Sequence, residues 1–340
     1  MTGPDDDIAT VRDADQLDWA ALDRWLHETI DLPDAPLTVQ QFTAGRANLT
    51  YLVTIGATKV VVRRPPKGTI APGAHDMARE AKVLDGLRDA YPRAPRLLAF
   101  CEDISVIGAP FVVTEFRDGV VVQQDVPSSM VDIDDVTRRL DLALVDAAAD
   151  LHAIDIGAVG LGDLGRPDGF AARQVSGWTD RWHRAAPGEP IPVMDEVAEA
   201  LGASVPSPPK ASIIHLDLKL DNCRFAASDP DTVTSVFDWD MATLGDPLFD
   251  LGLMVSSSSA MPVWTISTDE VIDRYRHRSG IEVADFGWYL SFATWRTAVV
   301  LQQLANRWLS GDSADDRLAG FAAHVPVLGE RARELLAGRR

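Results

Sequence analysis

Short runs of alternating apolar and polar residues fill the first third of the chain, a pattern typical of β-strands. The segments "LTVQQFTAG" (37–45), "NLTYLVTIG" (48–56) and "KVVVRRPP" (59–66) are separated by turns or by a break that contains glycine. This arrangement predicts a three-stranded antiparallel meander. The segment "PFVVTEFRDGVVV" (110–122) predicts another strand pair.

Helical periodicity flanks these strands. Apolar side chains follow helical spacing over residues 22–30, and Asp15 is the candidate N-cap of that helix. The segment "AHDMAREAKVLDGLRDA" (74–90) places Met77 and Leu84 on one helical face. We therefore predict one helix before the meander and one after it.

The pattern becomes mostly helical from about Asp134. Residues 134–155 carry apolar side chains at helical spacing, whereas residues 160–210 are rich in glycine and proline. The region after Pro247 is predicted to be helical, with a break at the serines of 256–259. The chain thus divides into a mostly β first third and a mostly α remainder.

This division predicts an α+β protein of two lobes. We expect a small antiparallel β lobe over residues 1–117 and a larger, mostly helical lobe over residues 120–340. A hinge is expected at 115–119, where a strand gives way to a connection that contains glycine. The cleft between two such lobes is the usual place for a ligand.

Composition and charge exclude some partners. The chain has 340 residues, 46% of them apolar and 24% charged, an ordinary balance for a soluble globular protein. Its formal net charge of −19 argues against binding to nucleic acid or to an anionic membrane. A cationic substrate is compatible with that charge, which also simply favours solubility.

The cysteines and the N-terminal residues indicate a compartment. Cys101 and Cys223 are the only cysteines, so no disulfide framework can form, and the chain suits a reducing cytosol. The acidic N-terminus "MTGPDDDIATVRDAD" lacks the apolar core of a signal peptide. Because no apolar run approaches the length of a membrane span, we expect a cytoplasmic protein.

The strongest chemical signal is "IIHLDLKLDNCRF" (213–225), which places polar groups on a short apolar run. Asp217 and Asn222 are five residues apart, and Asp238 follows in "SVFDWD". A general base beside a carboxamide and a second carboxylate suits Mg²⁺-dependent phosphoryl transfer, in which hard oxygen ligands hold the metal. The spacing matches the catalytic loop of kinases.

Five strings together carry a family resemblance: "RRPPKG", "HDMAREAKVLDGL", "PFVVTEFRDG", "HLDLKLDN" and "FDWDMATLGDPLFDLG". In this order they resemble the aminoglycoside phosphotransferase-type (phosphotransferase enzyme) family. The branch they most resemble contains the kinase-like domain of certain acyl-CoA dehydrogenase fusions. The resemblance implies a protein-kinase-like fold with a catalytic loop at 213–225, a metal-binding segment at 236–252 and a variable insertion at 160–210.

The resemblance also implies roles in the larger lobe. Asp217 would be the catalytic base, and Lys219 would offset charge near the γ-phosphate. Asn222 and Asp238 would be the Mg²⁺ ligands. His215 would be a scaffold residue. Two further acids would be structural, Asp250 by anchoring the backbone of the catalytic loop and Asp246 by capping the helix that follows.

Nucleotide contacts are implied in the smaller lobe. Arg63 stands where most kinases have lysine, and Glu80 would be its partner on a helix. The loop "TAGRANLTY" keeps only Gly45 of a glycine-rich pattern, so phosphate contacts would come from backbone amides around Arg46–Asn48 and from the side chain of Asn48 or Thr50. Hinge backbone groups would bind adenine. These hinge residues are Glu115, Phe116 and Arg117.

Several alternatives remain open at this point. Arg63 and Glu80 are alternatively a surface ion pair, and Asp240 is either a second metal-facing carboxylate or an exposed cap. Cys223 with His215 and Asp221 is a weaker candidate for a transition-metal site. The tryptophans at 178, 182, 288 and 295 favour core packing over a substrate platform.

The predicted function is ATP-dependent transfer of a γ-phosphate to a hydroxyl of a small molecule, with Mg²⁺ and with GTP as the alternative nucleotide. The segment at 160–210 and the C-terminal helices would recognise the acceptor. One rival is a nucleotide-binding pseudokinase that senses or scaffolds. A protein kinase is disfavoured, because Asp238 and "GDPLFDLG" leave little room for a peptide-docking loop.

Overall fold

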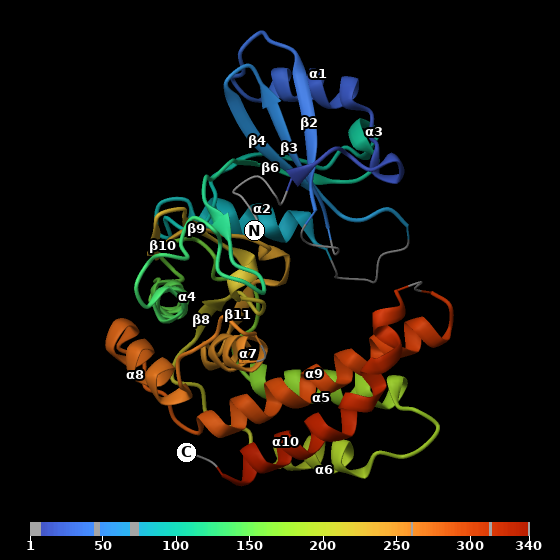
Figure 1. The fold of residues 1–340 in the computed structure, drawn as a ribbon, viewed down its shortest axis with the longest axis vertical. Helices are drawn as coiled ribbons and strands as arrows, with labels where there is room; N and C mark the ends of the chain where they lie inside the picture. The colour runs from blue at the N-terminus through green and yellow to red at the C-terminus, as the bar shows by residue number, and fades with distance from the viewer. Residues whose placement is uncertain (1–7, 44–47, 69–74, 260, 313–314, 339–340) are drawn as a thin grey trace.

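The structure is a computed structural model and describes residues 8–43, 48–68, 75–259, 261–312 and 315–338. Figure 1 shows a sheet at one end of the molecule and most helices at the other. The sheet has six strands in the order β1-β2-β3-β4-β6-β5, and every neighbouring pair is antiparallel. The strands are β1 (Ile8–Ala9), β2 (Leu37–Phe42), β3 (Leu49–Ile55), β4 (Thr58–Arg64), β5 (Leu97–Cys101) and β6 (Phe111–Glu115).

The predicted meander is confirmed by β2, β3 and β4. Tyr51 pairs with Val62 and Val53 with Val60, so alternate side chains of both strands face the same core. Helix α1 (Trp19–Thr29) buries Leu22 and Leu26 in that core. A short helix, α3 (Ile104–Ile107), adds Ile107 to it.

The predicted N-cap of α1 is wrong. Asp18, not Asp15, accepts a hydrogen bond from the backbone of Ala21 and caps the helix. Asp15 lies in the short 3₁₀ helix η1 (Asp13–Asp15), and its carboxylate accepts hydrogen bonds from Arg12 and Gln41. Asp15 therefore links η1 to Gln41 of β2, and its side chain does not cap α1.

Helix α2 (Met77–Leu87) contributes to two cores. Met77 and Ala81 pack against the sheet with Val112, whereas Leu84 and Leu87 belong to the large core of the helical half. In Figure 1 the helix lies between the sheet and the helices of the other half of the molecule. It is therefore an element through which the two halves of the molecule are packed together.

The prediction that residues 110–122 form one strand pair is wrong. β6 belongs to the six-stranded sheet, but β7 (Val120–Val121) pairs with β9 (Cys223–Ala226). This second sheet has the order β10-β9-β7, in which β10 is Asp229–Val236. Gly119 adopts φ +142°, and a Cβ there would lie 2.5 Å from the backbone oxygen of Phe225. The chain thus crosses from one sheet to the other at the predicted hinge, through a conformation that favours glycine.

The helical half surrounds one large hydrophobic core. A third sheet pairs β11 with β8, and both small sheets frame the loops that carry the polar motifs. The strands are β8 (Ser212–Ile214), β9 (Cys223–Ala226), β10 (Asp229–Val236) and β11 (Thr243–Gly245). The helices are α4 (Val136–His152), α5 (Phe170–Ala185), α6 (Pro192–Ala203), α7 (Leu248–Ser258), α8 (Thr268–Ser279), α9 (Phe286–Leu309) and α10 (Val325–Ala337). Short 3₁₀ helices are η2 (Leu220–Asn222), η3 (Trp239–Met241) and η4 (Asp316–His324).

Two further predictions concern these helices. The break predicted at 256–259 is misplaced, because α7 continues through Ser258 and ends with Ser259 as its C-cap. The four tryptophans at 178, 182, 288 and 295 are buried in the large core, as predicted. Among the described residues, no helix combines the length and apolar character needed to cross a bilayer.

Candidate active site

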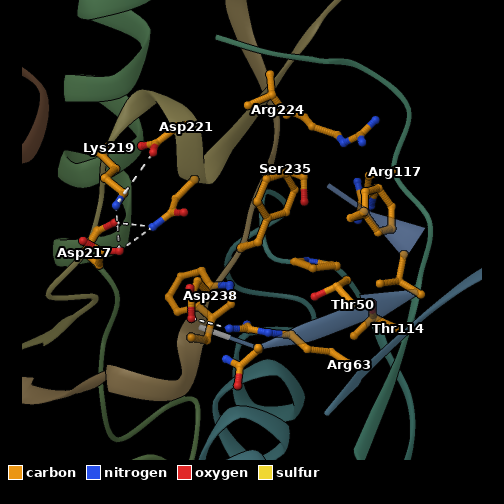
Figure 2. A pocket seen from close by; sticks show the side chains of 18 of the residues that line it. Thr50, Arg63, Thr114, Arg117, Asp217, Lys219, Asp221, Arg224, Ser235 and Asp238 are labelled. Atoms are coloured by element: carbon orange, nitrogen blue, oxygen red, sulfur yellow. Dashed lines mark hydrogen bonds and ion pairs between the residues drawn. The ribbon is translucent and has the colours of Figure 1, made fainter. Parts of the chain in front are cut away.

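A cavity of about 660 Å³ lies between the six-stranded sheet and the loops of the helical half. Figure 2 shows Thr50, Arg63 and Thr114 on one wall and Asp217 and Lys219 on the opposite wall. Every predicted site residue that the structure describes lines this cavity. They are Asn48, Arg63, Glu80, Glu115, Phe116, Arg117, Asp217, Lys219, Asn222 and Asp238. The predicted residues Gly45 and Arg46 lie outside the described part of the chain.

The loop that carries Asp217 is held by a buried carboxylate. The backbone amides of His215 and Leu216 both donate to Asp250, each over 2.6 Å. Leu216 adopts φ +67°, a left-handed conformation that is costly for a branched side chain. Burial raises the pKa of Asp250, but the hydrogen bond from His152 and the backbone donors outweigh it, so that pKa lies below its ordinary value.

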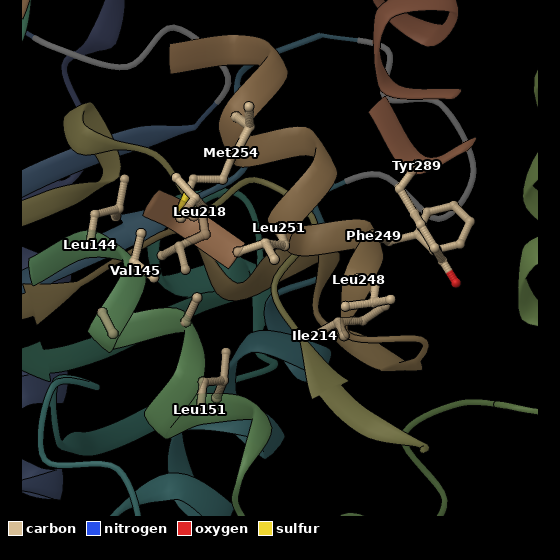
Figure 3. Packing of buried hydrophobic residues seen from close by; sticks show 14 of the residues in the cluster. Leu144, Val145, Leu151, Ile214, Leu218, Leu248, Phe249, Leu251, Met254 and Tyr289 are labelled. Atoms are coloured by element: carbon tan, nitrogen blue, oxygen red, sulfur yellow. The ribbon is translucent and has the colours of Figure 1, made fainter. Parts of the chain in front are cut away.

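The helix behind this loop belongs to the large core. Figure 3 shows Leu251 and Met254 of α7 close to Leu218 of the loop and Leu144 of α4. Asp250 sits on the same helix with 1% of its surface exposed. The loop is therefore fixed to a rigid element by both apolar contacts and hydrogen bonds.

The prediction that Asp246 caps α7 is wrong: Pro247 is the N-cap. Asp246 precedes it and accepts from the amide of Leu248 and from the hydroxyl of Tyr289.

His215 links the loop to the segment that precedes Asp238. Its Nε2 lies 2.8 Å from the carbonyl oxygen of Phe237, and its Nδ1 lies 3.3 Å from the amide nitrogen of Asp217. The amide of Asp217 donates to Nδ1, so Nε2 is the ring nitrogen that donates to the carbonyl oxygen of Phe237. Both ring nitrogens are engaged with the backbone, which suits a scaffold residue.

Asp217 is oriented by two neighbours. The Nδ2 of Asn222 donates to Oδ2 and to the backbone oxygen of Asp217, each over 2.8 Å. The Nζ of Lys219 lies 3.2 Å from the same Oδ2. Burial lowers the pKa of Lys219, but the charges of Asp217 and Asp221 raise it further, so the ammonium persists. The carboxylate is 37% exposed and faces the cavity with its position fixed through one oxygen.

Arg63 bridges two carboxylates inside the cavity. Its Nη1 contacts Glu80 over 2.7 Å, and its Nη2 makes a close ion pair with Asp238. Burial raises the pKa of Glu80 to about 7 although Arg63 opposes it. Arg63 is 9% exposed and Glu80 4%, so the alternative of a surface ion pair is wrong.

Asp238 and Asp240 lie next to each other with different environments. Asp238 adopts φ +71°, and Arg63 holds its pKa below the ordinary range against the effect of burial. Burial and the charge of Asp238 raise the pKa of Asp240. Asp240 is buried and accepts from Asn48 Nδ2 over 3.1 Å, so it is not an exposed cap. His75 lies 3.6 Å from the same oxygen.

The hinge residues form the far end of the cavity. The Oε1 of Glu115 accepts from the amide of Arg96 and from Arg117, each over 2.7 Å. Two cations approach the Phe116 ring: its centroid lies 5.1 Å from Lys59 and 5.4 Å from Arg224. The hinge backbone thus runs beside an aromatic ring at the cavity wall.

Arg224 was missed by the sequence analysis. It is 5% exposed, lines the cavity, donates to the backbone oxygen of Gly119 over 3.0 Å and lies 5.6 Å from the Phe42 ring. A signal existed, because an arginine follows Asn222 by two residues within an apolar strand. Thr50, a candidate phosphate contact, also lines the cavity. Thr114 and Ser235 line it too but carry no sequence pattern that singles them out.

The donor set around the cavity fits a hard cation. Asn222 uses Nδ2 to reach Asp217, which leaves its amide oxygen for another partner. With the carboxylates of Asp217 and Asp238 this gives the oxygen ligands that Mg²⁺ prefers. Cys223 does not suit a transition metal, because it lies in the core, where burial raises the pKa of its thiol.

Comparisons with known proteins agree with this geometry. The sequence profile of the phosphotransferase enzyme family matches residues 38–282. Acyl-CoA dehydrogenase family member 10 of Mus musculus is 29% identical over 296 residues, which are 82% of this chain and 27% of the relative. Member 11 of Homo sapiens is 28% identical over 353 residues, 97% of this chain and 44% of the relative. The chain thus spans less than half the length of these curated relatives.

Solved structures show the same architecture. A provisionally assigned aminoglycoside phosphotransferase from Ralstonia eutropha JMP134 has a TM-score of 0.81 and 27% identity, over 96% of this chain and all of the other. The aminoglycoside phosphotransferase APH(4)-Ia, in a ternary complex with ADP and hygromycin B, has a TM-score of 0.62 and 14% identity, over 93% and 98%. The predicted two-lobed kinase-like fold and the predicted family are confirmed: this chain belongs to the phosphotransferase enzyme family.

Proposed function

We propose that the chain transfers the γ-phosphate of ATP to a hydroxyl of a small molecule, with Asp217 as the base. The convergence of Asp217, Asn222 and Asp238 on one cavity carries this proposal. These residues come from two loops, and Arg63 reaches the same cavity from a strand 175 residues away from Asp238 in sequence. A structural turn would satisfy its polar groups locally and would not gather them at a cavity.

The transfer step follows from the positions of the side chains. Asp217 accepts the proton of the acceptor hydroxyl while that oxygen forms a bond to the γ-phosphorus, and the bond from phosphorus to the β-phosphate oxygen breaks. ADP leaves with the electron pair of that bond. Lys219, which touches Asp217 through Oδ2, lies where it can stabilise the charge of the transferring group. Alignment of the two reactants supplies much of the remaining acceleration.

Asn222 and Asp238 would hold Mg²⁺, which would neutralise phosphate charge during the transfer. Arg63 would contact phosphate in addition to Glu80 and Asp238, because a guanidinium has five N–H donors. Backbone groups of Glu115–Arg117 would bind the base. ATP is preferred over GTP as the proposed nucleotide, since the similar fold of APH(4)-Ia was solved with ADP.

The acceptor would bind beside Asp217 on the helical side of the cavity, where Met261 and Arg317 complete the lining. Structures with related folds belong to proteins that act on different alcohols, among them an aminoglycoside phosphotransferase and a macrolide 2′-phosphotransferase. Fold alone therefore does not choose the acceptor.

One observation favours a second candidate, a nucleotide-binding pseudokinase. The close ion pair between Arg63 and Asp238 engages one oxygen of a proposed metal ligand. If that pair persisted with nucleotide bound, the metal would lose a ligand. The intact set of Asp217, Lys219 and Asn222 favours catalysis over this alternative.

Turnover of Mg–ATP with a panel of alcohols tests the proposal. We expect phosphorylated product from the wild type and a loss of roughly 10²- to 10⁴-fold in kcat for Asp217→Asn, the range for removal of a positioned general base. Asp89→Asn, which removes an exposed carboxylate outside the cavity, serves as the control. Tight ATP binding without any phosphorylated product would support the pseudokinase instead.

A further inference from the structure

An arginine and two aromatic rings meet at the hinge end of the cavity. The guanidinium carbon of Arg224 lies over the Phe116 ring, 5.4 Å from its centroid, and over the Phe42 ring, 5.6 Å from its centroid. All three residues line the cavity. Arg224 belongs to β9, Phe116 to the hinge, and Phe42 is the last residue of β2. A planar cation of the helical half is thus held next to aromatic rings of the hinge and of the six-stranded sheet.

Strand β9 determines the direction of the Arg224 side chain. Successive side chains of a strand face opposite sides. Cys223 and Phe225 accordingly belong to the large core, whereas Arg224 faces the cavity. The Nη1 of Arg224 donates to the backbone oxygen of Gly119 over 3.0 Å, and the residue is 5% exposed. Backbone alternation, a hydrogen bond and burial therefore all fix this cation at the cavity wall.

The cross-strand neighbour of Arg224 also points to a ligand at this wall. Ser235 of β10 pairs with Arg224, is 1% exposed and lines the cavity. Its hydroxyl has no hydrogen-bond partner in the part of the chain that the structure describes. A buried hydroxyl without a partner costs free energy, which a polar ligand would recover. The wall formed by Arg224 and Ser235 is thus suited to a planar ligand with polar atoms.

This wall is remote from the proposed transfer step. Figure 2 shows Arg224 and Arg117 on the side of the cavity away from Asp217 and Lys219. If the phosphates of the proposed nucleotide lie near Asp217, the base lies at the hinge, between the six-stranded sheet and β9. One face of the base would then meet Phe42, and the other would meet Arg224.

Stacking is the contact that such a geometry offers. A guanidinium stacks on planar π systems, and every nucleobase has a π face. A base that enters between Arg224 and Phe42 replaces one cation–π contact by two stacking contacts. Because cation–π contacts are stronger when they are desolvated, the burial of Arg224 increases the contribution of this contact to binding.

We propose that Arg224 forms one face of the nucleobase site and binds the base by stacking opposite Phe42. The inference rests on the proposed phosphotransferase function and adds a binding residue to its nucleotide site. Since every base has a π face, the contact would strengthen the binding of adenine and of guanine alike. Arg224 would therefore supply affinity for a base, and the hinge backbone would choose between ATP and GTP.

Three magnesium-bound triphosphates test the stacking contact. Non-hydrolysable analogues of ATP and GTP carry a base, whereas ribose 5-triphosphate carries the sugar and the phosphates without one. The ratio of the Kd of the ribose triphosphate to the Kd of a nucleotide therefore measures what the base contributes. Calorimetry on the full chain gives each Kd, so the readout does not depend on turnover.

We expect Arg224→Leu to weaken the binding of both nucleotides roughly five- to thirtyfold, the range for a desolvated cation–π contact, and to leave that of the ribose triphosphate unchanged. Arg224→Lys retains a cation and should lose less. Phe42→Leu, which removes the opposite ring, should also weaken only the nucleotides. Arg307→Gln removes an exposed arginine of α9 and should change none of the three constants. Thermal unfolding shows that each variant is folded.

Several results would overturn the stacking contact. The first is a base contribution that survives Arg224→Leu, and the second is a wild type that binds all three triphosphates equally. An equal loss for the ribose triphosphate would mean that the charge of Arg224 acts on phosphate. A loss confined to the GTP analogue would mean that Arg224 reads the edge of guanine and does not stack.

The outcomes also separate this inference from the proposed function. If the wild type phosphorylated an alcohol while the base contribution did not depend on Arg224, the phosphotransferase function would stand and the stacking contact would fall. If Arg224→Leu removed the base contribution but the wild type phosphorylated no alcohol, the stacking contact would stand and the phosphotransferase function would fall.

Discussion

Arg63 determines the charge balance of the cavity, because three carboxyl groups surround its guanidinium. It contacts Glu80 and Asp238 directly, and Asp240 lies 3.9 Å away. Buried ions are tolerated only while their partners remain, and removing one partner leaves an uncompensated charge. Arginine can bridge two carboxylates because its fork is planar, whereas the compact ammonium of lysine acts as one point.

The first prediction concerns this bridge. Replacing Arg63 by methionine should destabilise the fold by about 3 kcal/mol, because Glu80 and Asp238 then lose their shared cation. Arg63→Lys should cost less, about 1 kcal/mol, since positive charge is retained. Urea denaturation at neutral pH measures both values.

A double variant checks the cause of that loss. Adding Asp238→Asn to Arg63→Met removes the orphaned charge of Asp238, so we expect part of the stability to return. Glu80, whose pKa is about 7 even beside Arg63, is protonated once Arg63 is removed. If the double variant were as unstable as the sum of the two single variants, lost packing and not charge would explain the effect.

At the residue scale, the sequence predicted those groups whose partners are close in the chain. Asp217, Asn222 and Lys219 lie within one short loop, so their spacing alone indicated shared chemistry. The hydrogen bond from Asn48 to Asp240 joins residues 192 positions apart, and no local sequence pattern predicts it. Arg224 was missed because its two aromatic neighbours come from distant segments.

Among the elements, helix α7 fixes the conformation of the loop that carries Asp217. Asp250 accepts two backbone amides and a hydrogen bond from His152, and this holds Leu216 in its left-handed conformation. A carboxylate can accept all three bonds, whereas an amide must turn its NH₂ group toward one of the donors. The position of Asp217 therefore depends on the ionised form of a residue in another element.

The second prediction follows from that contact. Asp250→Asn should destabilise the fold by about 2 kcal/mol at pH 7, the cost of leaving a buried donor unpaired. Because the pKa of Asp250 lies below its ordinary value, its contribution is complete above the ordinary aspartate pKa and is lost as pH falls through the folded pKa. The stability difference between wild type and variant, followed by urea denaturation from pH 7 downward, should therefore shrink in acid. A difference that stayed constant would exclude ionisation of Asp250 as its source.

The third prediction concerns the crossing between sheets. Gly119→Ala places a Cβ 2.5 Å from the oxygen of Phe225 at φ +142°, so a loss of about 2 kcal/mol or more is expected. Gly280→Ala is the matched control, because Gly280 also has positive φ, +68°, but meets open space. It should cost about 1 kcal/mol. Equal losses measured by thermal unfolding would show that backbone conformation, and not the close approach, dominates.

Strand prediction succeeded where the elements are long. The alternation in β2, β3 and β4 spans six or seven residues each and fixes which face is buried. β7 has two residues, and its partner β9 lies about a hundred positions further along the chain. Only tertiary packing selects such a pairing, which explains why 110–122 was predicted as one strand pair.

For the whole molecule, the cavity lies between the six-stranded sheet and the large core, and helix α2 packs against both. The sheet core and the large core are separate, and the predicted site residues come from both sides of the cavity. The predicted division of the chain into a lobe that ends at residue 117 and a lobe that begins at residue 120 stays a prediction. A ligand that fills the cavity would contact both halves and should therefore stabilise them together.

The fourth prediction uses that coupling to test the proposed metal ligands without turnover. At a hundredfold excess over its Kd, Mg–ATP should raise the free energy of unfolding by about 2.7 kcal/mol. ATP with EDTA should give a smaller gain, because the metal-bridged contacts to Asn222 and Asp238 are lost. In Asp238→Asn the gain should no longer depend on magnesium, whereas in Asp89→Asn it should match the wild type. If thermal unfolding showed the same magnesium dependence in Asp238→Asn as in the wild type, Asp238 would be no metal ligand, and its ion pair with Arg63 would be its sole role in the cavity.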